Sequence, residues 1–470
     1  MTLNAYGTRL ARGTFRPVEN TSPRAPTKAL WRAVALLLAL TLVATACATQ
    51  TRPEAADSSA EPSTTTLPTP PPSPTSTTVA PSATTSDPPG SPTPSTTSTV
   101  PPPLVTTGAQ RLVDSGFAAL DGLRVGLIAN QASLVRDGHL IDAFVDADNV
   151  ELVRVFAPEH GVRGNGGAGE EIGDTTDFST GTPIVSLYSD IRQPGDEHLA
   201  DIDVLVYDLQ DAGARFYTYI STMGLAMQSA ARTGTTFLVL DRPNPVGGGA
   251  SSGQILEQEQ VSFIGQYPIP AAYGLTAAEL AMAIKDQGWL EGLEPLSLDI
   301  ITMDGWERSM LWPDTGLEWV PPSSGLVSFE SSLAYPGSVL FEATELSYGG
   351  GSEEPFYRFG AEWADGEALA AALNARGLPG IVFEPVEYTP RKLPRNVSEP
   401  RLSGDRLQGV LLRFDDQYAF DAVATTLHIL AEFQIQATAE GLGSIIDRPA
   451  AFNLLSVSYT HLTLPTTPYV

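Results

Sequence analysis

The sequence predicts an α/β protein with a Rossmann-like, mostly parallel sheet domain at residues 105–252 and a smaller α+β domain at 253–455. In the first segment, runs of consecutive apolar residues alternate with runs of helical spacing. Such alternation indicates a mostly parallel sheet covered by helices on both faces. In the second segment the pattern loosens into mixed helices and strands rich in proline and glycine, which favours an α+β arrangement.

Apolar runs and helical spacing mark the expected elements in order. The strands are predicted at residues 123–130, 150–158, 182–188, 201–210 and 235–243. Helices are predicted at 139–147 and 217–233, because their apolar residues recur with helical spacing. Strands and helices therefore alternate along this part of the chain.

The first 47 residues resemble a bacterial export signal. A basic stretch precedes the apolar run 33–46, which is too short to span a bilayer comfortably. The run ends in small residues at Cys47, and Ala44-Thr-Ala-Cys47 resembles a lipobox, although leucine is usual where Ala44 stands. We expect residues 1–47 to be a signal peptide and Cys47 to be lipidated, which anchors the protein to the outer face of the cell membrane. The alternative is a plain secretory signal with a chance cysteine.

Two further segments have compositions unlike those of a folded domain. Residues 48–104 consist largely of proline, serine and threonine, which favours a disordered, extended stalk. Residues 456–470 have neither periodicity nor helix caps and resemble the translation of a sequencing adapter. We therefore expect this tail to be non-native and the C-terminal domain to be truncated.

Charge and cysteine content exclude several classes of function. The formal net charge of −27 argues against nucleic-acid binding and against adhesion to anionic lipid through a basic face. A single cysteine excludes an intramolecular disulfide and a thiol-coordinated zinc site. We expect neither a metal nor a cofactor. A membrane contact is expected only through the lipid on Cys47.

Clusters of polar residues follow three of the predicted strands. Because ligands bind beyond the carboxyl ends of parallel strands, we expect these clusters to converge on one crevice. They comprise Glu159, His160 and Arg163; Asp208, Gln210, Asp211, Arg215, Tyr217 and Tyr219; and Asp241, Arg242 and Asn244.

The glycine run 164–169 has the spacing of a dinucleotide-binding fingerprint. That motif requires a following helix, whose N-terminus meets the pyrophosphate. Here the run is followed by Glu170, Glu171 and a stretch of Asp, Thr, Ser and Gly without helical periodicity. The sequence therefore argues against dinucleotide binding, and we expect the glycines to form a flexible crossing.

Six segments carry a resemblance to a known family. They read "PEHGVRGNGGAGE", "YDLQDAGARFYTYISTM", "DRPNPVGG", "YGLTAAELA", "WPDTGLEWVPPS" and "YPGSVLFEATELSYGGGSEEPF". In order and spacing they are similar to the exo-β-N-acetylmuramidase family called NamZ, over about residues 108–455. The resemblance implies an active site in the cleft between the two domains. It also implies removal of β-1,4-linked N-acetylmuramic acid from the non-reducing ends of peptidoglycan or muropeptide glycans.

The resemblance implies roles for several carboxylates. Glu159 matches the glutamate of the family's EHG motif, and we expect it to be the acid that protonates the glycosidic oxygen. Phe156 and Pro158 could raise its pKa by making the site partly apolar. Most glycosidases need a second carboxylate, for which Asp208, Asp211, Asp241 and Glu342 are candidates. Of these we assign Asp208 and Glu342 to catalysis and the other two to substrate binding.

Other residues are expected to contact the sugar. His160 could orient Glu159 or bind substrate, and Tyr217 and Asn244 suit contacts to hydroxyl or acetamide groups.

Arg163 and Arg215 could grip the lactyl carboxylate of N-acetylmuramic acid, since a guanidinium matches a carboxylate in two-pronged fashion. A structural ion pair with Asp208 or Asp211 is an equal alternative for Arg215.

The chain also departs from the family pattern. Tyr348 and Gly350 stand where the family usually has a glutamate and an arginine, and Tyr273 stands where a histidine is common. These changes support an alternative function, a catalytically impaired peptidoglycan-binding lipoprotein. An esterase or deacetylase is weakly supported, because the sequence has neither a GxSxG elbow nor a histidine-rich metal set.

Overall fold

The computed structural model describes residues 104–163, 173–394 and 399–446, which belong to a single compact unit of the chain. The predicted signal peptide with Cys47, the stalk, the glycine run 164–169 and the C-terminal tail lie outside the described residues. Among the described helices, none combines the length and apolar character that a membrane span requires.

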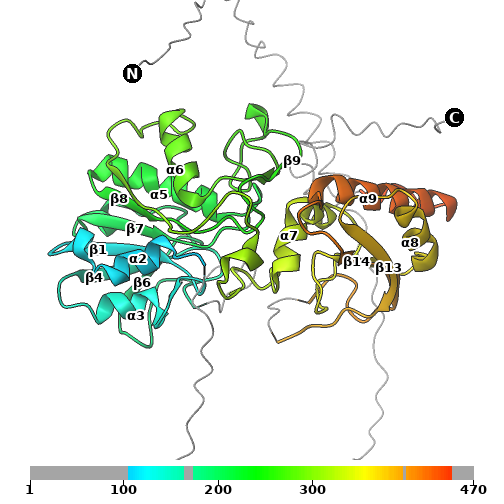
Figure 1. The fold of residues 1–470 in the computed structure, drawn as a ribbon, viewed down its shortest axis with the longest axis horizontal. Helices are drawn as coiled ribbons and strands as arrows, with labels where there is room; N and C mark the ends of the chain where they lie inside the picture. Colours follow the sequence, from blue (N-terminus) through cyan, green and yellow to red (C-terminus); the bar gives the residue numbers. More distant parts are fainter. Residues whose placement is uncertain (1–103, 164–172, 395–398, 447–470) are drawn as a thin grey trace, which may run out of the picture. The chain divides into compact units, whose positions relative to one another are not determined.

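A seven-stranded sheet forms the first domain, in the order β11-β8-β7-β1-β4-β6-β5 (Figure 1). All neighbouring strands are parallel except the edge strand β5, which pairs antiparallel with β6. The strands are β1 Arg124–Ala129, β4 Glu151–Ala157, β5 Thr175–Thr176, β6 Pro183–Ser186, β7 Val204–Asp208, β8 Thr236–Leu240 and β11 Leu298–Ile301. This arrangement confirms the predicted mostly parallel sheet.

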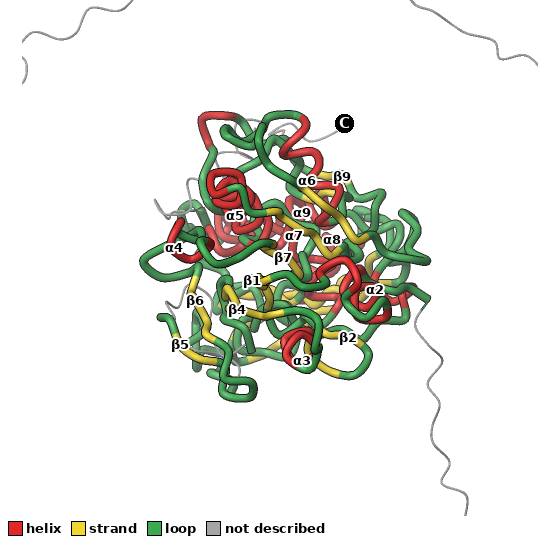
Figure 2. Tube along the Cα trace, turned by 90° about the vertical axis from the view of Figure 1, so that its left-hand side faces the viewer, coloured by secondary structure: helices red, strands yellow, loops and turns green. Residues whose placement is uncertain are grey.

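Helices cover both faces of the sheet, because successive residues of each strand point to opposite sides. In β7, for example, Leu205 and Tyr207 belong to one core cluster, whereas Val204 and Val206 belong to another. The helices of the first face are α4 Asp196–Leu199, α5 Tyr219–Thr233 and α6 Ala277–Asp286, and those of the second are α2 Gly108–Asp114 and α3 Leu140–Val145. Figure 2 shows α5 and α3 on opposite sides of β1 and β4.

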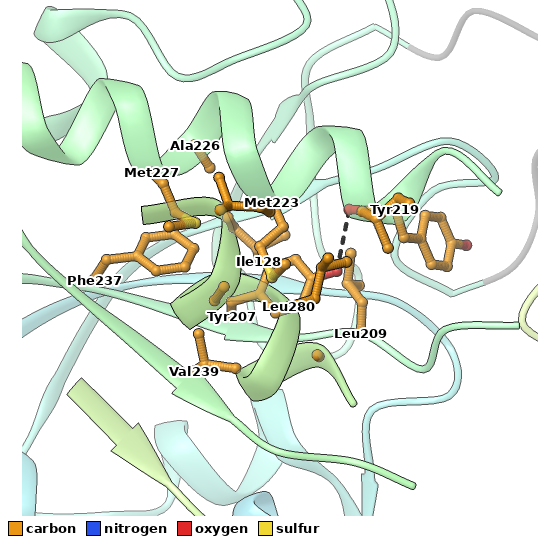
Figure 3. Packing of buried hydrophobic residues seen from close by; sticks show 14 of the residues in the cluster. Ile128, Tyr207, Leu209, Tyr219, Met223, Ala226, Met227, Phe237, Val239 and Leu280 are labelled. Atoms are coloured by element: carbon orange, nitrogen blue, oxygen red, sulfur yellow. Dashed lines mark hydrogen bonds between the residues drawn. The ribbon is translucent and has the colours of Figure 1, made fainter. Parts of the chain in front are cut away.

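Side chains of α5 pack closely on the sheet. Met223 and Met227 lie against the strand residues Tyr207 and Phe237 (Figure 3). The buried Tyr207 hydroxyl donates a hydrogen bond to the carbonyl of Tyr219 at 3.1 Å, which satisfies its polar group inside the core. This packing fixes the start of α5, whose preceding loop contributes to the site described below.

A smaller domain follows, with its own hydrophobic core. Its antiparallel sheet has the order β12-β14-β13, with β12 Arg358–Ala361, β13 Ile381–Tyr388 and β14 Leu407–Phe414. Its helices are α7 Phe329–Ser338, α8 Gly366–Asn374 and α9 Ala422–Ala439. This α+β arrangement agrees with the sequence expectation.

Short elements complete the described chain. They are the antiparallel strand pairs β2 Leu134–Val135 with β3 Gly138–His139 and β9 Ser251–Ser252 with β10 Ala272–Tyr273, and the 3₁₀ turns η1 Ala118–Leu120, η2 Gln258–Gln260, η3 Trp312–Thr315 and η4 Val339–Ala343.

The parallel sheet continues past residue 252, where the sequence pattern placed the domain boundary. β11 pairs with β8, although it lies about 45 residues beyond that point. β11 is an edge strand whose residues are only partly buried or exposed, so it has no continuous apolar run that would identify it.

A buried ion pair joins the carboxyl ends of β7 and β8. Both carboxylate oxygens of Asp208 accept hydrogen bonds from Arg242, at 2.6 and 2.8 Å, and the two side chains are 0 and 5% exposed. Asp208 is the last residue of β7, and Arg242 follows the end of β8. The pair therefore holds two neighbouring strand ends in register at the edge where the sequence places the polar clusters.

We expect Asp208→Ala to lower the free energy of unfolding by about 3–5 kcal/mol, because Arg242 would stay buried without its carboxylate. Urea denaturation of the purified protein measures the change. The control is Asp304→Ala, which breaks a pair with Arg111 whose side chains are 67 and 36% exposed. The control should lose no more than about 1 kcal/mol. Equal losses in the two variants would contradict the role given to the buried pair.

Candidate active site

A cavity of about 260 Å³ collects residues from loops that follow three strands of the parallel sheet. Glu159 and His160 follow β4, Tyr188 follows β6, and Tyr217 follows β7. Further lining residues come from the later part of the chain, and they are Ser323, Ser324, Gly325, Tyr335, Val339, Glu342, Tyr348, Gly350, Gly351, Ser352, Pro355 and Phe356. The expected convergence of strand-end loops is thus present for part of the predicted set.

A tight turn directs Glu159 into this cavity. His160 and Gly161 both have left-handed backbones, with φ of 75° and 76°, and the Gly161 amide donates to the Pro158 carbonyl at 3.1 Å. A histidine in this conformation costs about 1–3 kcal/mol, and such strain is concentrated at functional sites. The turn brings His160 to the cavity wall beside Glu159, as expected from the sequence.

Two hydroxyl groups fix Glu159. The Thr218 hydroxyl donates to Oε2 of Glu159 at 2.8 Å, and the Tyr219 hydroxyl lies 3.3 Å from the Glu159 carbonyl oxygen. Tyr219 also donates to the Pro322 carbonyl at 2.8 Å. The glutamate is 9% exposed, so its carboxylate is held in one place with little contact to bulk water.

Glu342, from the 3₁₀ turn η4, lines the same cavity. Its side chain is accessible through the opening, yet surrounding protein desolvates the carboxyl, and this raises its pKa to about 7. The Arg401 charge opposes the rise, whereas the negative charge of Glu159 adds to it. The two carboxyl groups therefore interact electrostatically. Arg401 also donates to the carbonyls of Glu342 and Leu346, at 3.1 and 2.9 Å, which fixes the segment that carries Glu342.

Aromatic rings form much of the wall. Tyr335 makes edge contacts with Tyr217 and Phe356, at ring-centre distances of 6.0 and 4.9 Å, and Tyr348 stacks on Phe356 at 5.1 Å. A rigid aromatic wall with a few convergent polar groups is typical of a small-ligand site. Tyr217 is part of this wall.

Other predicted site residues lie outside this cavity. Asp208, assigned to catalysis from the sequence, has both oxygens bound by Arg242 and no exposed surface, so it holds strands together and does not face a ligand. Asp241 accepts from the Thr276 hydroxyl at 3.1 Å and from the Ala278 amide at 3.0 Å, at the start of α6. Burial raises the pKa of Asp241 to about 6.

Asp211 and Asn244 are also occupied by the protein itself. Asp211 accepts hydrogen bonds from the Tyr273 hydroxyl and, at 2.9 Å, from the Gly213 amide; burial raises its pKa to about 6. The Asn244 amide donates to the carbonyls of Tyr273 and Leu275 at 2.8 and 2.9 Å. Both residues stabilise the loops behind the cavity, which corrects their predicted substrate contacts.

The two arginines expected to bind the lactyl carboxylate have other partners. Arg163 forms ion pairs with Asp177 and Asp142, both at 3.0 Å. Arg215 is 1% exposed and donates to the backbone carbonyls of Gln254 and Ile269 at 2.6 and 2.7 Å. Neither arginine lines the cavity. The alternative ion pair of Arg215 with Asp208 or Asp211 is not formed in the described part of the chain.

Sequence reasoning assigned no role to Thr218, Tyr188, Tyr335 or Phe356, although all line the cavity. Tyr188 follows β6 and obeys the same strand-end rule that selected the other clusters, so that rule could have found it. The departures Tyr348 and Gly350 lie in the cavity wall, whereas the third, Tyr273, is buried beside Asp211.

Comparison with known proteins gives a consistent assignment. Residues 125–330 match the model "Exo-beta-N-acetylmuramidase NamZ, N-terminal", and residues 333–458 match its C-terminal counterpart. The peptidoglycan β-N-acetylmuramidase NamZ of Bacillus subtilis (strain 168) is 38% identical over 329 residues, which is 70% of this chain and 77% of that protein.

Solved structures show the same fold. Two DUF1343 family proteins from Bacteroides fragilis NCTC 9343 match with TM-scores of 0.69 and 0.60 and identities of 36 and 27%. Each match covers 76% of this chain and 89% of the other. Because the family models and the Bacillus relative span most of the described residues, the chain belongs to the NamZ family of exo-β-N-acetylmuramidases.

Proposed function

We propose that the protein is an exo-acting glycosidase that removes β-1,4-linked N-acetylmuramic acid from the non-reducing ends of peptidoglycan fragments during cell-wall turnover. The observation that carries the proposal is the pair Glu159 and Glu342 in one aromatic-walled cavity. Glycosidases use two carboxyl groups that flank the scissile bond. The family membership and the activity of the Bacillus relative support the same substrate class.

Glu342 is suited to protonate the leaving oxygen. Desolvation by the surrounding protein raises its pKa to about 7, so that a proton remains on the carboxyl near neutral pH. A general acid works best when its pKa is close to the operating pH. The acid role that the EHG motif suggested for Glu159 therefore passes to Glu342 in our proposal.

Glu159 then serves as the second carboxylate. The hydrogen bond from Thr218 and the strained turn at His160 hold it in a fixed position before substrate arrives. A fixed carboxylate can stabilise the positive charge that develops on the sugar ring, at no cost of reorganisation during the reaction. Asp208, Asp211 and Asp241 are excluded from this role by their contacts within the protein.

The two glutamates can be distinguished by measuring kcat/KM with two substrates that differ in their leaving group. We expect Glu342→Gln to lower kcat/KM for an N-acetylmuramyl-N-acetylglucosamine disaccharide by roughly 10²–10⁴-fold, the usual contribution of a general acid. The loss should be much smaller for 4-nitrophenyl β-N-acetylmuramide, because 4-nitrophenolate needs little protonation to leave. Glu159→Gln should lower kcat/KM strongly for both substrates.

The matched control is Glu367→Gln, which changes an exposed glutamate at the start of α8. It should leave both rates unchanged. If Glu342→Gln reduced both substrates equally, Glu342 would not be the acid.

The pH dependence follows from the raised pKa of Glu342. The carboxyl is protonated below about pH 7 and loses its proton above it, so kcat/KM for the disaccharide should fall as the pH rises through about 7. Rates across the range from pH 5 to about pH 9 measure this limb. The residual activity of Glu342→Gln should no longer show it. An unchanged alkaline limb in that variant would assign the titration to another group.

One observation favours a second candidate, a module that binds glycan without turnover. Two residues that depart from the family pattern, Tyr348 and Gly350, lie in the cavity wall. Turnover of the nitrophenyl muramide by the full-length protein separates the two functions. Binding of glycan by a correctly folded protein that releases no 4-nitrophenol would support the module.

We further propose that the protein is an exported lipoprotein on the outer face of the cell membrane. The basic stretch, the short apolar run and the lipobox-like Ala44-Thr-Ala-Cys47 support this location. The proline-rich residues 48–104 would hold the enzyme at a distance from the membrane, within reach of its polymer.

Substitution of the cysteine tests the anchor. When produced in a bacterial host, the wild-type chain should partition into the detergent phase of Triton X-114. The Cys47→Ser variant should partition into the aqueous phase, because it lacks the thiol to which the acyl chains are attached. Metabolic labelling with a fatty acid should mark the wild type alone. A Cys47→Ser variant that stays in the detergent phase would contradict the anchor.

A further inference from the structure

Arg192 lies between two aromatic rings near the cavity. The centre of its guanidinium is 3.8 Å from the ring centre of Tyr188 and 5.1 Å from that of Phe263. Tyr188 is in the loop that follows β6, whereas Phe263 comes from a segment more than 70 residues later. Contacts of this kind attract a cation to the ring faces and leave the edge of the guanidinium for hydrogen bonds.

The hydrogen-bonding capacity of Arg192 is not used up by the described protein. Its Nη1 atom is buried and has no acceptor, and no carboxylate lies within ion-pair distance of it in residues 104–163, 173–394 and 399–446. A buried donor without an acceptor is costly, at about 1–3 kcal/mol. By contrast, Arg401 donates to backbone carbonyls of the segment that carries Glu342.

Tyr188 connects this arginine to the reaction site. The tyrosine lines the cavity. Burial raises its pKa, the nearby charge of Glu159 raises it further, and Arg192 lowers it. Because Arg192 stacks on Tyr188, its guanidinium lies against a residue of the cavity wall.

The charge of the cavity wall is unfavourable for an anionic ligand. Among the described residues that line it are two glutamates but neither lysine nor arginine. The negative charge of Glu159 would repel an anionic ligand there unless a positive charge lay within reach. The charge of Arg401 acts on Glu342, but its guanidinium donates to backbone carbonyls of the segment that carries Glu342. N-acetylmuramic acid carries such an anion, the lactyl carboxylate, which N-acetylglucosamine lacks.

We propose that Arg192, held against Tyr188 and Phe263, binds the substrate's lactyl carboxylate and sets the preference for N-acetylmuramic acid over N-acetylglucosamine. A stacked guanidinium presents two parallel N–H groups, which match the two oxygens of a carboxylate. This is the role that the sequence suggested for Arg163 and Arg215, whose contacts lie elsewhere. The choice of ligand rests on the proposed function, but Arg192 acts in binding and not in bond cleavage.

Equilibrium binding tests the proposal independently of turnover. The probes are free N-acetylmuramic acid and N-acetylglucosamine, titrated calorimetrically into the full-length protein. Arg192→Gln should weaken binding of N-acetylmuramic acid by roughly 10- to 100-fold, the usual worth of a hydrogen bond to a charged group. Binding of N-acetylglucosamine should change less than about twofold, since that sugar has no carboxylate.

Two further variants sharpen the result. Phe263→Leu keeps the charge but removes one ring, and it should weaken N-acetylmuramic acid binding by about twofold to fivefold, the worth of one cation–π contact. The matched control is Arg232→Gln, which removes an exposed arginine paired with Asp196 on the helical surface. It should leave both affinities unchanged, and thermal unfolding verifies that each variant is folded.

Loss of affinity for both sugars alike, or an unchanged preference in Arg192→Gln, would overturn the assignment. So would a wild-type protein that binds the two sugars equally well. Turnover of the nitrophenyl muramide is measured separately. A preference that depends on Arg192 without any turnover would support the binding role and count against the glycosidase.

Discussion

The arrangement of the site depends on the buried contact between Asp208 and Arg242. These side chains join the ends of β7 and β8. The loops that form the site begin at the same edge of the sheet. The loop after β7 carries Tyr217 and Thr218 to the cavity, and Thr218 holds Glu159, which arrives from β4. An ion pair inside the protein thus positions a carboxylate with which it has no direct contact.

The layered fold could be predicted because its central strands are recognisable in the sequence. Residues such as Leu205 and Val206 face opposite covered sides, so β7 reads as a continuous apolar run. β11 has no such run because it lies at the sheet edge, with little of its surface covered. The extent of the first domain was therefore not evident from the pattern alone.

The site could be predicted only in part. Strand-end position and the motif resemblance selected Glu159, His160, Tyr217 and Glu342, all of which line the cavity. The same reasoning could not separate Asp208 or Asn244 from them, because a polar residue at a strand end can equally bind its own protein. Which partner each carboxylate or guanidinium finds depends on loops distant in sequence, as the contact of Arg192 with Phe263 illustrates.

The cavity is assembled from parts of the chain that are far apart, and this has a consequence for biogenesis. Glu159 belongs to the first half of the folded region, whereas Glu342 and Phe356 come much later. Closing so long a loop is slow compared with the formation of local helices. As the chain is made, the sheet can begin to form as soon as its strands are available, but the two carboxyls meet only after the polypeptide extends beyond Phe356. Hydrolytic capability therefore arises late, after both domains have folded.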